Sequence, residues 1–149
     1  MAEVLLRHAL KAEDEPLRSL EVISAGVSAY EGNPCTTHSV RVLSKVGLDL
    51  STHRSRPLTH ELLDKSVLVI GMTESHRQII QRNAPNLKAP VILMRELMPG
   101  TVDPEVPDPY GSDLRTYEAT RDAIVEAIPS VVNYLKELLE TPREDARPR

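Results

Sequence analysis

The sequence predicts an α/β fold in which helices are layered on a parallel sheet. Two features of the 149 residues support this prediction. Segments with strand character alternate with segments of helical periodicity, which is typical of parallel strands joined by helices. The strongest apolar run, VLVIGM at residues 67–72, is continuous rather than alternating. A continuous apolar run is typical of a strand that is covered on both faces, as in a parallel sheet.

The first third of the chain is expected to contain two helices and one strand. Apolar residues at helical spacing predict a helix over residues 2–13. The short β-branched run LEVISA predicts a strand over residues 20–25. Thr36 or Thr37 is expected to cap a second helix, which Gly47 ends.

The remaining elements follow the same alternation. Thr59 and Thr73 are expected to cap helices on either side of the central strand. A second apolar strand is expected at residues 90–94. A long helix is expected from about residue 113 to residue 139, and Pro129 should kink or split it.

The length of the chain suits one hydrophobic core. We expect residues 1–140 to form a single α/β domain, because neither an internal repeat nor a linker interrupts them. Residues 141–149, TPREDARPR, are expected to form a disordered tail because they are charged and rich in Pro.

Composition excludes several classes of function. The net charge is −4, so the chain does not have the basic surface that is typical of nucleic-acid-binding proteins. No apolar run reaches the length of a membrane span, so no membrane partner is expected. Cys35 is the one cysteine, which excludes an internal disulfide and fits a reducing compartment. A cytoplasmic location is therefore expected.

Four segments carry a resemblance to a known family. They are residues 1–6 (MAEVLL), 23–26 (ISAG), 47–59 (GLDLSTHRSRPLT) and 106–124 (VPDPYGSDLRTYEATRDAI). In this order they resemble the low-molecular-weight protein tyrosine phosphatases, over roughly residues 1–139. The resemblance implies a three-layer sandwich with a parallel sheet.

The resemblance also implies a mechanism. In this family a Cys thiolate in a C-x5-R loop attacks the phosphorus of a phosphorylated protein substrate, and no metal or other cofactor is required. The motif match implies that Asp108 is the general acid and that Tyr110 lines the substrate slot. Tyr30 is expected to form the other wall, and His53 to make a structural hydrogen bond.

The chain departs from the family pattern at its start. Relative to the family it lacks the first strand and the whole Cys-to-Arg loop, so we expect it to be inactive as written. It could be an N-terminally shortened form of an active phosphatase, or a non-catalytic relative that binds a protein partner. The absent strand would lie between residues 20–25 and 67–72. We therefore expect low stability, unless a strand-donating partner or self-association completes the sheet.

A third interpretation makes Cys35 the nucleophile. Cys35 and Arg41 are spaced as C-x5-R in the stretch CTTHSVR. The intervening residues include no Gly, so a tight nest of backbone N–H groups would be strained. No apolar strand leads into Cys35, and we expect it to mark the start of an ordinary helix.

Overall fold

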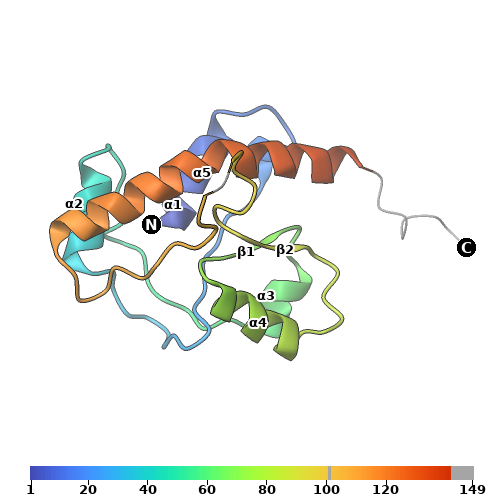
Figure 1. Cartoon of the computed structure of the whole chain (residues 1–149), viewed down its shortest axis with the longest axis horizontal. Coiled ribbons are helices and arrows are strands. Elements are labelled where there is room, and N and C mark those ends of the chain that lie inside the picture. The colour runs from blue at the N-terminus through green and yellow to red at the C-terminus, as the bar shows by residue number, and fades with distance from the viewer. Residues whose placement is uncertain (101, 142–149) are drawn as a thin grey trace, which may run out of the picture.

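The computed structural model describes residues 1–100 and 102–141 (Figure 1). In chain order the elements are α1 (Ala2–Lys11), the 3-10 helix η1 (Leu17–Ser19), α2 (Thr37–Ser44), α3 (His60–Asp64), β1 (Val69–Gly71), α4 (Glu74–Asn83), β2 (Val91–Leu93) and α5 (Leu114–Glu140).

The two strands form a parallel pair. Val69 lies opposite Val91, and Gly71 lies opposite Leu93. Helix α4 connects β1 to β2, so the three elements form a βαβ unit. This confirms the predicted α/β class with parallel strands.

Helices lie on both sides of the strands. Figure 1 shows α1 and α5 on one side and α3 and α4 on the other. Helix α5 packs on α1 and α2, while α4 packs on both strands. The main buried cluster lies between the strands and the α1–α5 layer, and its largest fully buried side chains are Leu10, Leu43, Leu50 and Val131. The structure is therefore the layered sandwich that the family resemblance implies.

Threonine side chains begin three of the helices, as the sequence predicts. Thr36, Thr59 and Thr73 are the N-caps of α2, α3 and α4. Each hydroxyl accepts a hydrogen bond from the backbone N–H three residues later, which satisfies a donor that the helix leaves free. Gly47 follows α2 with a φ of 79°, a conformation that glycine adopts without strain.

Residues 20–25 do not form the predicted strand. Their exposure alternates between half-buried and exposed along the segment, as in a strand. Within the described part of the chain, however, no neighbouring backbone forms a ladder with them. Only Gly26, just after the segment, makes an isolated bridge, to Pro57. The prediction was wrong because a strand needs a partner for its N–H and C=O groups, whatever its propensity.

Pro129 does not split α5, contrary to one of the two predicted outcomes. The helix is continuous from Leu114 to Glu140 with Pro129 inside it. Proline removes one hydrogen bond to the carbonyl four residues earlier, that of Val125. Val125 and Pro129 both lie on the exposed side of the helix, where water can satisfy that carbonyl. Buried residues on the opposite side hold the helix against the core.

Two expectations concern the C-terminal tail and membrane-spanning segments. The expected tail, residues 141–149, lies outside the described residues except for Thr141. In the described part of the chain, no helix is long and apolar enough to cross a membrane.

Candidate active site

The loop that carries Asp108 starts beside the end of β1. Val106 is buried, and its N–H donates to the carbonyl of Met72 at 2.8 Å. Met72 directly follows β1, so this bond fixes the loop at the carboxyl edge of the strands. Ligands of open α/β sheets bind at this edge.

The Asp108 side chain is exposed and oriented by its own loop. Its Oδ1 accepts a hydrogen bond from the backbone N–H of Tyr110 at 3.0 Å. The N–H of Ser112 donates to the carbonyl of Pro109 at 2.9 Å, and Gly111 has a φ of 78°. These contacts form a tight turn that orients the Asp108 carboxylate.

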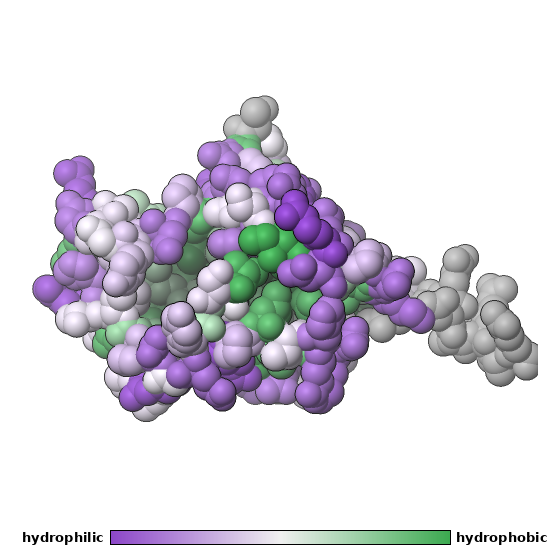
Figure 2. Space-filling model, turned by 90° about the horizontal axis from the view of Figure 1, so that it is seen from below, coloured by the Kyte–Doolittle hydropathy of each residue, from purple (hydrophilic) through white to green (hydrophobic). Residues whose placement is uncertain are grey.

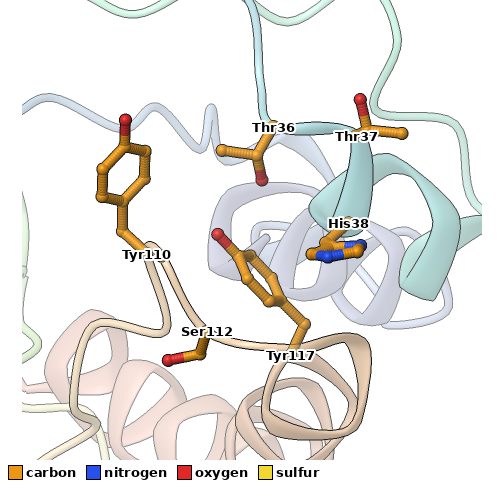
Figure 3. Close-up of a pocket in the computed structure, with 7 residues that line it drawn as sticks. Thr36, Thr37, His38, Tyr110, Ser112 and Tyr117 are labelled. Carbon is orange, nitrogen blue, oxygen red and sulfur yellow. The ribbon is translucent and has the colours of Figure 1, made fainter.

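A cavity of about 370 Å³ lies beside this turn (Figure 3). Its lining comes from the start of α2, from the turn and from the first part of α5: Thr36, Thr37, His38, Tyr110, Gly111, Ser112 and Tyr117. In Figure 3, Tyr110 and Thr36 stand on opposite sides, and the Tyr117 hydroxyl points between them. The lining therefore combines two aromatic rings with several hydroxyl groups.

His38 and Tyr117 form the inner wall of this cavity. Their ring centroids lie 5.3 Å apart, with the rings tilted by 58°. Nδ1 of His38 is buried and has no hydrogen-bond partner in the described structure. Sequence reasoning missed both residues as cavity residues. The signal for Tyr117 was its place in the fourth family segment, whereas His38 carried no distinguishing signal.

Tyr30 lies outside the cavity that Tyr110 lines. It belongs to the loop after Gly26 and is 80% exposed, while Tyr110 is 77% exposed. Ser55 donates its hydroxyl hydrogen bond to the Tyr30 carbonyl and so fixes the loop backbone. Both tyrosine side chains thus project from the surface, and Tyr30 is not among the residues that line the cavity beside Tyr110.

A second cluster of polar side chains lies at the start of α1. The Glu3 carboxylate accepts hydrogen bonds from Arg7 and from the Ser24 hydroxyl. Nδ1 of His53 lies 3.5 Å from Glu3 Oε2, an ion-pair contact when His53 is protonated, and the hydrogen bond expected of this histidine stays a prediction. Burial acts to raise the pKa of the Glu3 carboxyl. The hydrogen bonds and the nearby His53 outweigh it and hold this pKa below its usual value.

Cys35 does not lie in a phosphate-binding loop. It precedes the N-cap Thr36, and Arg41 lies within α2, so helical backbone joins the two residues. Burial raises the pKa of the Cys35 thiol, although the charge of Arg54 partly opposes this effect. A raised pKa reduces the thiolate fraction that a nucleophile needs.

In the described part of the chain, no three His, Cys, Asp or Glu side chains come together as metal ligands. The groups available for chemistry are therefore a positioned carboxylate, hydroxyls, rings and backbone donors.

The model of one protein family, low molecular weight phosphotyrosine protein phosphatase, matches residues 1–141. The chain belongs to this family. Among curated members, a protein-arginine-phosphatase of Geobacillus stearothermophilus is 33% identical over 129 residues, which are 87% of this chain and 83% of the relative. A protein-arginine-phosphatase of Bacillus subtilis is 35% identical, over 91% of this chain and 87% of the relative.

A solved low molecular weight phosphatase has the same fold. The crystal structure of the low molecular weight protein tyrosine phosphatase from T. tengcongensis superposes with a TM-score of 0.79 at 30% identity. The match covers 89% of this chain and 88% of that chain. The family resemblance and the fold expected from sequence are therefore both confirmed.

Proposed function

We propose that this family member acts on a phosphorylated protein, with Asp108 as the general acid. The carboxylate lies on an exposed turn at the carboxyl edge of the strands, beside a cavity. In the first step it would protonate the leaving atom of the phosphorylated side chain. In the second step it would take a proton from the water that hydrolyses a phosphocysteine. The hydrogen bond from the Tyr110 N–H supports this role, because it fixes the carboxylate.

Tyr110 and Tyr30 are proposed to flank the phosphorylated side chain of the substrate. Both rings are largely exposed, and large exposed aromatic side chains are typical of recognition surfaces. A phosphotyrosine ring could stack on one of them, and a guanidinium could stack on either ring. The two curated relatives described above are named as arginine phosphatases, which favours phosphoarginine as the substrate.

The nucleophile is proposed to lie outside residues 1–149, which makes this chain inactive as written. Three observations support this part of the proposal. Cys35 is the one cysteine of the sequence, burial raises its pKa, and a helix follows it where a phosphate loop would be required. A cytoplasmic location is proposed for the same protein, because Cys35 has no second cysteine within residues 1–149 with which to form a disulfide.

The deciding experiment uses the protein isolated from its own cells. Intact mass is compared with 16.6 kDa, and hydrolysis of p-nitrophenyl phosphate and of a phosphoarginine peptide is measured on the same sample. We expect a larger mass, with a Cys and an Arg in the added residues, together with turnover. In that protein Asp108→Asn should lower kcat by about 10²–10⁴-fold.

Two matched variants make the assignment specific. Asp103→Asn, on the same loop and exposed, should leave kcat unchanged, and so should Cys35→Ser. Loss of turnover in Cys35→Ser, with folding retained, would show that Cys35 is the nucleophile after all. An unchanged kcat in Asp108→Asn would remove the general-acid role.

The second candidate function is non-catalytic binding of a protein partner. The exposed Tyr30 and Tyr110 favour it independently of any nucleophile. It is the expected function if the native mass equals 16.6 kDa and neither substrate is hydrolysed. Binding of phosphopeptides to the 149-residue protein, measured by calorimetry, then replaces turnover as the assay.

A further inference from the structure

The first turn of α4 is in contact with the loop that carries Asp108. Thr73 caps this helix, and its hydroxyl accepts a hydrogen bond from the N–H of His76 at 3.3 Å. Glu74 is the first residue of α4, so its own N–H has no partner within the helix. This N–H donates to Oε1 of Glu105, at 2.7 Å. A side chain of the Asp108 loop therefore completes the capping of α4.

The hydrogen bond between Glu105 and α4 combines three favourable features. Its length lies at the short end of the usual range of about 2.7–3.2 Å. The acceptor is a carboxylate, and the donor belongs to the N-terminus of a helix, where the helix dipole favours negative charge. Both residues are half-buried, which limits competition by water. The bond therefore holds Glu105 firmly against the start of α4.

The start of α4 is itself joined to the end of β2. Arg77 forms an ion pair with Glu74 and donates to both carboxylate oxygens of Glu96 at 2.9 Å. Glu96 also accepts a hydrogen bond from the N–H of Leu93, the last residue of β2, at 2.8 Å. Because these contacts connect α4 to the strands, the Glu74 N–H is a fixed point to which the loop is attached.

Glu105 and its neighbour attach the loop to two different elements. Glu105 binds α4, and the N–H of Val106 donates to the carbonyl of Met72, directly after β1. Only Pro107 separates Val106 from Asp108, and its ring fixes one of the intervening backbone angles. These two attachments therefore determine where the Asp108 carboxylate can lie.

We propose that Glu105 is a positioning residue for the general acid Asp108. The inference rests on the proposed function, because it assumes that Asp108 transfers a proton. The contacts that carry it lie within residues 72–106, so none involves the first residues of the chain. Without the Glu105 bond, the loop keeps only the Val106 attachment and can tilt relative to the strands. A displacement of about 1 Å at a reacting group can cost about 10²-fold in rate.

The alternative is that Glu105 only stabilises the fold. Figure 2 views the protein from the side on which α3 and α4 lie in Figure 1, and it shows hydrophilic side chains around an apolar hollow. Charged contacts at a hydrophilic surface contribute little to stability. A stabilising role would change the amount of folded enzyme and nothing in its chemistry. A positioning role changes how the rate depends on the leaving group.

The test compares two phosphate esters as substrates of the native protein. Phenolate is a more basic leaving group than p-nitrophenolate, so hydrolysis of phenyl phosphate depends more on protonation by the acid. Glu105→Ala should lower kcat/KM for phenyl phosphate by at least about tenfold and that for p-nitrophenyl phosphate by less, as should Asp108→Asn. Glu105→Gln keeps an oxygen that can accept from the Glu74 N–H and should restore most of the rate. Thr59→Ala, which removes the N-cap of α3, should leave the ratio of the two kcat/KM values unchanged.

Two variants of Glu74 isolate the donor of the hydrogen bond. Glu74→Pro removes the N–H and suits the first position of a helix. The preceding Thr73 already has the extended backbone that a following proline requires, with a φ of −134° and a ψ of 160°. Glu74→Ala removes the same side chain and keeps the N–H. The ratio of the two kcat/KM values should therefore shift more in Glu74→Pro than in Glu74→Ala, and adding Glu105→Ala to Glu74→Pro should cause no further shift.

The outcomes separate this inference from the proposed function. An unchanged ratio in Glu105→Ala, alongside a shifted ratio in Asp108→Asn, would overturn the positioning role and leave the general acid in place. Absence of turnover in the native protein, or unchanged kinetics in Asp108→Asn, would overturn the proposed function and this inference with it. If Glu105→Ala does not fold, the comparison of Glu74→Pro with Glu74→Ala decides, and equal ratios in those two variants would overturn the positioning role.

Discussion

Leu10→Ala tests the contact between the first and last helices of the chain. Leu10 is 1% exposed and belongs to the buried cluster between α1 and α5. Truncation removes buried methyl groups and leaves a cavity that rigid helices can only partly close. The expected cost is about 3 kcal/mol, within the usual range of roughly 2–5 kcal/mol for such changes.

Urea denaturation followed by circular dichroism measures this cost. With an m-value of about 2 kcal/mol per molar, the midpoint should fall by about 1.5 M. Val125→Ala is the matched control, because Val125 lies on α5 and is 45% exposed. Its midpoint should move by less than about 0.25 M, since exposed substitutions stay within about 0.5 kcal/mol. Equal shifts in the two variants would refute the packing of α1 against α5.

Three further changes have defined outcomes. Thr73→Ala removes the N-cap of α4 and should cost about 1 kcal/mol in urea denaturation, whereas Thr73→Ser should be nearly neutral. Gly47→Ala forces a side chain into a φ of 79° and should cost about 1–2 kcal/mol by the same assay. The Glu3 carboxyl has a lowered pKa in the folded state, so its stabilisation is present above the unfolded value of 4.5 and is lost as pH falls through the folded pKa. Melting temperatures from pH 7 to pH 3 should therefore fall less steeply in Glu3→Gln, and identical slopes would contradict this role.

Local chemistry made most of the fold predictable from sequence. Three helix starts were predictable because an N-cap threonine accepts a hydrogen bond from a backbone N–H only three residues later. These threonines are Thr36, Thr59 and Thr73. The strand at 69–71 was predictable because its apolar run is continuous, as is typical of strands that helices cover on both faces. Residues 20–25 have the same propensity, but whether they pair depends on a neighbour that local sequence does not contain.

The candidate site was less predictable for the same reason. Asp108 and Tyr110 lie in one short motif, so the family resemblance was enough to select them. His38 and Tyr117 meet only because α2 packs on α5, and nothing local to either residue indicates that contact. Tyr30 was expected to form the wall opposite Tyr110; the two side chains come from separate loops, and Tyr30 is not among the residues that line the cavity beside Tyr110.

The packing of α1 on α5 also affects how the protein is made. These helices lie at opposite ends of the chain, more than a hundred residues apart. At about 5–20 residues per second, a ribosome needs roughly 6 to 25 seconds to add α5 after α1 has emerged. During that time the leucine face of α1 lacks the α5 part of its packing, so some of its apolar surface stays exposed to aggregation or chaperone binding until α5 is made.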